Sequence, residues 1–470
     1  MTDKSRLEAN IRKYEEASRD GKIVYLDVDD LIDIADYYDD NNDTPKALEV
    51  ADYAAKLFPG ATLPLCFKAR GAIASGDIEM AERYAEEIEE KDDVEYTYLK
   101  AEIFLARGET SAADMLLAEE YDGTVDEEKD LLVYDATEMF FDYEEYDLAR
   151  KWLNKSNNKD DTEYKELLSK IAVACGQFAE SQKILNHLLD TDPFSLKYWN
   201  MLASSQFLSN DIPNSLESAD FALAIDNGDA EATLIKANAL YTLDNIEEAL
   251  AYFERYNTLM HGSEIGELFV GSCLSHLRRY DDAIMHLEKA AAMCHPSSPT
   301  LLHIYRELVV CYNYIHDFDK AVSCTEKAKQ HPECDKSEIL LLKGLCYISK
   351  GDKKMAEDYI NAAIEEANPD QLALILINAA ATALDSKYPE TAYRLLITLL
   401  GKDSETEHHD GWGYFALACF QLNKTDEFLY GLQKVCRYNP GEARVTLAKI
   451  FPEGLPVEDY VAYYKNNFLK

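Results

Sequence analysis

Long apolar runs are missing from this sequence of 470 residues. The longest run covers residues 372–384 and falls short of the roughly 20 apolar residues that a helix needs to cross a bilayer. Residues 1–22 also hold no apolar stretch of the kind that a secretory signal requires. These absences predict a cytoplasmic protein that does not bind membranes.

Catalytic and cofactor motifs are missing as well. The sequence contains no phosphate-binding loop, no glycine-rich dinucleotide motif, no zinc-protease helix motif and no nucleophile-elbow motif. Its ten cysteines include no C-x-x-C pair, so we interpret them as reduced and mostly buried side chains. We therefore predict that the protein is not an enzyme, that it has no catalytic residue and that it needs no cofactor.

Two segments contain metal-binding residue types without the spacing that a metal site needs. Residues 39–43 place oxygen atoms at alternate positions, as a calcium loop does, but Thr44 stands where that loop requires glycine. The histidines and cysteines of residues 286–334 lack the short paired spacings that are common in zinc sites. We predict turns between helices in both segments and no bound metal.

Basic residues are scarce, because 47 lysines and arginines stand against 88 aspartates and glutamates, for a net charge of −41. This balance argues against sequence-independent binding to nucleic acid. The excess is dense in residues 119–147, where thirteen acids accompany one base, Lys129. If that excess has a role beyond solubility, the partner protein should present a basic surface.

Glycine and proline are sparse, with 19 and 13 residues, but they stand at regular positions. Glycines such as Gly351 fall in predicted turns between helices, and no proline falls inside a predicted helix. Both residue types mark the phase of a repeat with a period near 34 residues. The units start near residues 28, 62, 94, 129, 162, 196, 230, 264, 302, 337, 373 and 409.

Each unit carries two small residues at fixed positions, such as Ala237 and Ala249 in the unit that starts near 230. Small side chains let two antiparallel helices approach closely. No segment alternates apolar and polar residues as a strand would. The pattern predicts an all-α repeat array over residues 28–442, between a capping helix in residues 1–27 and capping helices in residues 443–470.

Two units carry a recognisable set of large and small residues. The first is Trp199, Leu202, Ala203, Phe207, Ser215 and Ala222, and the second is Leu340, Gly344, Tyr347, Ala356 and Ala363. This spacing resembles the tetratricopeptide repeat family, over about residues 28–442. The resemblance implies a right-handed α-solenoid of antiparallel helix-turn-helix units, whose first helices line a concave face.

The resemblance also implies which residues face the groove, because positions 2, 5, 9 and 12 of each first helix do so in this family. On the central units these positions give a predicted partner-binding groove of Asn200, Phe207, Asn238, Tyr241, His303, Arg306 and Asn313. Amides can donate to and accept from a peptide backbone, and aromatic rings supply apolar contact. We therefore predict a scaffold or adaptor that binds a partner protein or extended peptide in its groove.

Towards the C-terminus the same positions become apolar. They read Leu374, Ile377, Leu384, Leu417 and Phe420. Such residues indicate closed core or, as an alternative, the surface of a homodimer.

Two alternative functions stay open at this point. The first is an enzyme or enzyme subunit with a site inside the solenoid, for which the groove offers only His303 beside Arg306 and no carboxylate. The second is a cell-envelope binding protein that lacks its signal here.

Overall fold

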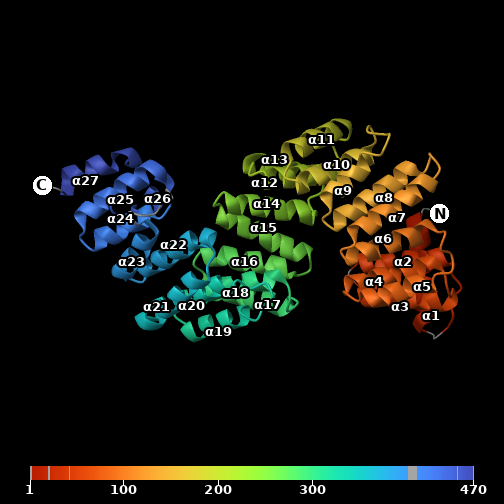
Figure 1. Ribbon diagram of the computed structural model, residues 1–470, viewed down its shortest axis with the longest axis horizontal. Coiled ribbons are helices and arrows are strands. Elements are labelled where there is room, and N and C mark those ends of the chain that lie inside the picture. Colours follow the sequence, from red (N-terminus) through yellow and green to blue (C-terminus); the bar gives the residue numbers. More distant parts are fainter. Residues whose placement is uncertain (1–2, 20–21, 42, 401–409, 453, 469–470) are drawn as a thin grey trace. The chain divides into compact units, whose positions relative to one another are not determined.

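The computed structural model describes residues 3–19, 22–41, 43–400, 410–452 and 454–468. In these ranges the chain forms 27 α-helices, one short 3-10 helix and no strand (Figure 1). The chain divides into two compact units, Met1–Asp211 (unit 1) and Ile212–Lys470 (unit 2). The predicted all-α helical-repeat solenoid is confirmed.

Unit 1 consists of a terminal helix followed by helices that pack pairwise along the chain. Its elements are α1 (Asp3–Arg19), α2 (Val28–Asp40), α3 (Thr44–Leu57), α4 (Thr62–Ala74), α5 (Ile78–Glu87), α6 (Val94–Ala106), α7 (Thr110–Gly123), α8 (Lys129–Asp142), α9 (Tyr146–Leu153), α10 (Thr162–Ala174), α11 (Phe178–Thr191) and α12 (Leu196–Leu208). The first helices α4 and α6 also contact one another, as do α8 and α10.

Unit 2 repeats this arrangement and ends in three shorter elements. Its elements are α13 (Ile212–Ile225), α14 (Ala230–Thr242), α15 (Ile246–Leu259), α16 (Glu264–His276), α17 (Tyr280–Met293), α18 (Pro299–Tyr314), α19 (Phe318–Ala328), α20 (Lys336–Lys350), α21 (Lys353–Glu366), α22 (Pro369–Asp385), α23 (Pro389–Leu400), α24 (Trp412–Gln421), α25 (Thr425–Tyr438), α26 (Pro440–Thr446), the 3-10 helix η1 (Val457–Asp459) and α27 (Tyr460–Phe468). The first helices α18, α20 and α22 contact one another in series.

The helix starts follow the repeat phase closely. The first helix of each pair begins within four residues of its predicted start, and the start predicted at 409 lies outside the described residues. The predicted boundary at 443 falls inside α26, which begins at Pro440. Aspartates such as Asp27 and Asp77 cap helices by accepting hydrogen bonds from backbone N–H groups. Gly351 ends α20 with a φ of 86°, as its predicted turn position requires.

The predicted small residues form the contact between paired helices. Ala237 and Ala249 are both fully buried. In the pair α10 and α11, serines hold the two positions, and the hydroxyls of Ser169 and Ser181 lie 2.8 Å apart in a buried hydrogen bond. Close approach of the helices therefore depends on side-chain size at these sites, and in this pair the two buried hydroxyls satisfy one another.

The contact between α16 and α17 at Gly271 leaves no space for a larger side chain. A Cβ atom at this position of α16 would lie 2.7 Å from Cγ of Leu287, which is fully buried in α17. We expect Gly271→Ala to lower the free energy of unfolding by about 1–3 kcal/mol in a urea titration, because this overlap outweighs the gain in helix propensity. Gly123→Ala in α7 is the control, since a Cβ there meets no atom within 4 Å. Equal stability of the two variants would contradict the prediction.

Candidate functional site

An acidic groove crosses the first helices of unit 1. It encloses about 460 Å³ on the face that α4, α6 and α8 share. The residues that line it, hereafter the acidic groove, are Arg70, Ile73, Ala74, Glu95, Tyr98, Glu102, Asp135, Glu138, Met139, Asp142 and Tyr143. Arg70 is the one cation among them, against five carboxylates.

The charge of Arg70 is already neutralised inside the groove. Its guanidinium lies 3.3 Å from a carboxylate oxygen of Glu95 and donates to Glu102 at 3.0 Å. On the adjoining helix, the hydroxyl of Tyr98 donates to Asp135 at 2.8 Å. The remaining carboxylates of α8 therefore face the groove without a cation on α4 or α6 to balance them.

Burial and mutual repulsion disfavour the charged form of these carboxylates. Burial raises the pKa of Asp142, the nearby Glu138 adds to the effect, and the charge of Lys170 on α10 opposes it. Burial likewise raises the pKa of Asp135, with Glu95 and Glu138 acting in the same direction. Burial also raises the pKa of Glu102 despite the opposing charge of Arg70. A cation entering the groove would relieve this repulsion.

A second hollow of about 440 Å³ continues from α8 to α10 and α12. Its lining residues are Glu138, Asp161, Thr162, Glu163, Glu166, Leu167, Lys170 and Lys197. Both lysines are paired, because Lys170 contacts Glu138 at 3.3 Å and Lys197 contacts Glu166. The two hollows together hold eight different carboxylates and three cations, a net charge of −5.

A third hollow in unit 2 has a different character. It encloses about 530 Å³ between α18, α20 and α22. The residues that line it, hereafter the apolar groove, are Val309, Val310, Asn313, Tyr314, His316, Leu342, Leu345, Ile348, Ser349, Thr382, Asp385, Ser386 and Tyr388. Asp385 is its one carboxylate.

Three predicted site residues share one face of α18, as their spacing implies. Asn313 lines the apolar groove. Arg306 forms an ion pair with Glu338 of α20. His303 is exposed, and partial desolvation together with the Arg306 charge lowers its pKa.

The other predicted residues lie on other helices. Asn238 and Tyr241 are half-buried on α14, where the Tyr241 ring contacts the rings of Phe253 and His276. Phe207 is half-buried on α12. Asn200, on the same helix, is only 3% exposed, so little of its side chain is open to a partner in this structure.

The carboxylates of the acidic groove were missed by the sequence analysis, which considered the central units. The signal was present, because Glu95, Tyr98 and Glu102 hold positions 2, 5 and 9 of the unit that starts near 94. The carboxylates of α8 stand at other positions of their unit, so the repeat pattern does not place them in the groove and only the structure shows that they line it.

The apolar C-terminal positions are mostly core. Leu384 is buried, and Ile377, Leu417 and Phe420 pack against the same cluster. Leu374 is the exception, with 62% of its surface exposed. The structure thus places four of these five residues inside unit 2.

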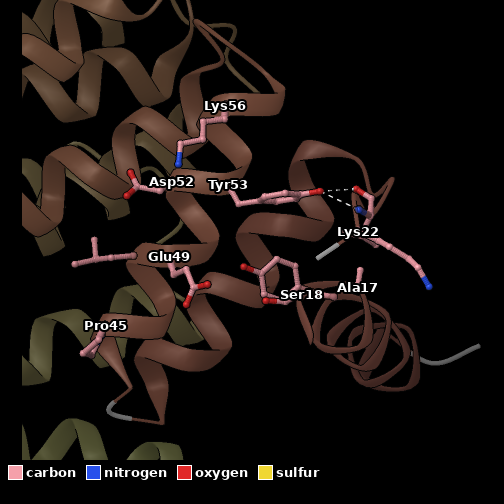
Figure 2. A pocket seen from close by; sticks show the side chains of 11 residues that line it. Ala17, Ser18, Lys22, Pro45, Glu49, Asp52, Tyr53 and Lys56 are labelled. Atoms are coloured by element: carbon pink, nitrogen blue, oxygen red, sulfur yellow. Dashed lines mark hydrogen bonds between the residues drawn. The ribbon is translucent and has the colours of Figure 1, made fainter. Parts of the chain in front are cut away.

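A pocket of about 400 Å³ between α1 and α3 has a structural role (Figure 2). The hydroxyl of Tyr53 accepts a hydrogen bond from the backbone N–H of Val24 at 2.9 Å and donates to its carbonyl oxygen at 3.1 Å. These bonds hold the segment before α2 against α3.

Within the described ranges, no group of three or more His, Cys, Asp or Glu side chains is arranged to hold a metal ion. Of the helices in these ranges, none combines the length and the apolar character needed to span a bilayer.

Paired helices in series, with no strand in the described ranges, define an all-α helical-repeat protein. The family model of the tetratricopeptide repeat matches residues 337–370, which contain α20 and α21. Over these residues the chain is therefore similar to the tetratricopeptide repeat family, as its spacing predicted. That the other helix pairs are repeats of this family, and that they number twelve, stays a prediction.

Known proteins resemble parts of the chain. Anaphase-promoting complex subunit 7 of Dictyostelium discoideum is 25% identical over 214 residues, which cover 45% of this chain. The match covers 35% of that relative. Among solved structures, a chain of the APC/C hetero-tetramer Cut9–Hcn1 is 14% identical, with a TM-score of 0.39, 90% of this chain and 93% of that chain covered. YrrB, described as a TPR protein with an unusual peptide-binding site, is 17% identical, with a TM-score of 0.34. The match covers 40% of this chain and 95% of that chain.

Proposed function

We propose that this protein is a non-catalytic scaffold that binds a lysine- and arginine-rich segment of a partner protein in the acidic groove. The observation that carries the proposal is the charge of the groove: its one cation, Arg70, is already held by Glu95 and Glu102. Carboxylates that repel one another lower the stability of the free protein, and a basic ligand would compensate them. The relative in Dictyostelium is by its name a subunit of a protein complex, which supports a role in protein assembly.

The geometry of the groove favours an extended segment over a small molecule. The two adjoining hollows run across α4, α6, α8, α10 and α12, and more than half of the residues that line each of them are charged. Small-molecule sites are more enclosed and mostly apolar. A basic segment could place successive side chains against the carboxylates of successive helices.

The test measures binding of a fluorescein-labelled lysine–arginine peptide to the full chain by anisotropy. We expect saturable binding that weakens steeply as salt rises from 0.1 to 1 M, because the Debye length falls from about 10 Å to about 3 Å. A glutamate peptide of the same length should not bind. Binding of both peptides, or of neither, would refute the proposal.

Two triple variants distinguish binding in the acidic groove from attraction by the net charge of the chain. The triple variant Asp135→Asn, Glu138→Gln and Asp142→Asn should raise the Kd on the order of tenfold, since each exposed pair contributes up to about 1 kcal/mol. The control triple variant is Asp126→Asn, Glu127→Gln and Glu128→Gln, which removes the same charge from the connection between α7 and α8. Equal losses in both variants would show that net charge, and not the groove, attracts the peptide.

A further inference from the structure

Three pairs of successive units share a trio of side chains between their helices. In each trio, a lysine on a first helix forms an ion pair with an acid on the preceding helix, and its Nζ lies over the ring of a tyrosine on the following helix. The trios are Asp52, Lys68 and Tyr84, then Asp220, Lys236 and Tyr252, then Glu326, Lys343 and Tyr359. The distances from Nζ to the ring centroid are 4.4, 4.5 and 4.8 Å, so each lysine side chain occupies the space where three consecutive helices meet.

The positions of the trio follow the repeat. The lysine directly precedes the small residue of its first helix, the tyrosine follows it by 16 residues, and the acid stands 24 residues after the start of the preceding unit. In the unit that starts near 302, the first two positions hold Leu308 and Cys324, which are both smaller, whereas Glu288 keeps the acidic position on α17. Space that is filled in the three trios is therefore left open between α17, α18 and α19.

A hollow of about 510 Å³ lies at this place, within the size range of small-molecule sites. The residues that line it, hereafter the second-helix hollow, are Glu288, Ala291, Ala292, Tyr305, Leu308, Tyr312, Lys320, Ser323, Cys324 and Lys327. Leu308 is buried, and the alanines of α17 present no side chain beyond Cβ. None of these residues lines the apolar groove, so the two hollows use different sides of α18.

Helix α19 contributes two lysines and a hydroxyl to the hollow. Lys320, Ser323 and Lys327 are spaced three and four residues apart, which places them on one face of the helix. Nζ of Lys320 lies 5.2 Å from the ring centroid of Tyr312, and Nζ of Lys327 lies 5.8 Å from that of Tyr305. Both rings line the hollow, so both ammonium groups lie near it.

The charge of these lysines is only weakly balanced within the protein. Lys320 meets Asp317 at 3.7 Å, and Lys327 forms no ion pair in the described part of the chain. Glu288, the one carboxylate of the hollow, already accepts a hydrogen bond from a tyrosine of α18 at 2.6 Å. The surrounding sequence has the same bias, because residues 320–354 hold eight lysines and five acids in a chain whose net charge is −41. The hollow is therefore complementary to an anion.

We propose that the second-helix hollow binds a small amphipathic anion, with one anionic group on an aromatic or aliphatic body. The anionic group lies between the ammonium groups of Lys320 and Lys327 and accepts a hydrogen bond from the Ser323 hydroxyl. The body packs against Leu308 and occupies the space that a lysine and a tyrosine fill in the three trios. This site lies in unit 2 and does not rest on the acidic groove, whose charge is of the opposite sign.

The first test measures binding of 1-anilinonaphthalene-8-sulfonate, an aromatic anion whose fluorescence rises when it leaves water, to the full chain. We expect a single saturable site whose affinity falls as salt rises from about 0.1 to about 1 M, because salt screens exposed charges. Octanoate should displace the probe, and octylamine, which has an aliphatic chain of the same length and the opposite charge, should not. Absence of saturable binding, or equal displacement by both compounds, would overturn the proposal.

Filling the hollow tests where the probe binds. Leu308→Lys combined with Cys324→Tyr recreates the trio, with Glu288 as its acid, and should abolish probe binding. Ala292→Phe fills the hollow from an exposed position of α17 and should do the same without a buried substitution. Thermal melts followed by circular dichroism identify the variants that fold as the wild type does, and retained probe binding in any of these would overturn the proposal.

Neutralising the lysines tests the charge of the site. The double variant Lys320→Gln and Lys327→Gln should raise the Kd of the probe about tenfold, because the anion loses both charge-assisted contacts. It should leave unchanged the Kd of N-phenyl-1-naphthylamine, which is the probe without its sulfonate. The control variant Lys329→Gln and Lys336→Gln removes the same charge from exposed positions outside the hollow. Equal losses in the two double variants would show that net charge attracts the probe and would overturn the proposal.

Discussion

Replacing Trp152 with alanine is expected to lower the free energy of unfolding of unit 1 by about 3–5 kcal/mol. The side chain lies on α9 and is fully buried, in contact with residues of both α7 and α8. Its ring stacks on Phe140 with 6.3 Å between centroids and meets the edge of Tyr121 at 6.1 Å. Its Nε1 donates to Asp114 at 2.8 Å. The variant therefore leaves a large cavity and removes one hydrogen bond at once.

The phenylalanine variant separates these two losses. Trp152→Phe refills most of the volume but cannot donate to Asp114, which keeps its ion pair with Lys151 at 2.7 Å. We expect it to cost about 1–2 kcal/mol, well below the alanine variant. The measurement is a urea titration followed by circular dichroism, in which a repeat array can unfold in stages, so the early and late transitions are fitted separately. A loss below about 1 kcal/mol for Trp152→Ala would contradict the observed packing.

Replacing Glu267 with alanine is expected to destabilise unit 2 by about 2–4 kcal/mol at neutral pH. This carboxylate is 1% exposed near the start of α16. It accepts hydrogen bonds from Lys289 at 2.5 Å and from Asn257 at 2.8 Å, and it lies 2.6 Å from Nδ1 of His286. The residue thus joins α15, α16 and α17 through polar contacts that the alanine side chain cannot replace.

The pH dependence follows from the pKa of Glu267. Burial acts to raise it, but the hydrogen bonds from Lys289, Asn257 and His286 outweigh burial and lower the pKa below 4.5. A carboxyl whose pKa is lower in the folded state stabilises the fold above its unfolded value, and this contribution is lost as the pH falls through the folded value. The stability difference between the wild type and Glu267→Gln should therefore be largest near neutral pH and shrink progressively below pH 4.5.

Glu254→Ala supplies the control, because this exposed residue of α15 lies in the same unit and carries the same charge. It should change the free energy of unfolding by less than about 0.5 kcal/mol at any pH in this range. A difference for Glu267→Gln that stays constant from neutral pH to pH 3 would show that the carboxylate does not carry the effect.

The helix pairs could be predicted because the residues that determine them lie close together in the sequence. A small residue such as Ala237 and its partner Ala249 stand on adjoining helices of one unit, and the turn between those helices is short. Size, turn residues and capping aspartates all agree on the same boundaries, which is the condition under which sequence determines structure.

The candidate sites could be predicted only in part, because a groove is made by neighbouring units. Asn313 lines the apolar groove, Asn200 is only 3% exposed, and the carboxylates of α8 line the acidic groove outside the predicted positions. A first helix that turns slightly against its neighbour brings a different set of side chains to the shared face, and no residue within the helix specifies that rotation.

The sequence by itself thus determined the helical class, the period and the excess of acid over base. Only the tertiary structure decided which charges are already paired within the protein. Arg306 reaches Glu338 and Arg70 reaches Glu102, each across about one repeat of sequence. Such pairing depends on the packing of one unit on the next, so it becomes visible only when the helices are in place.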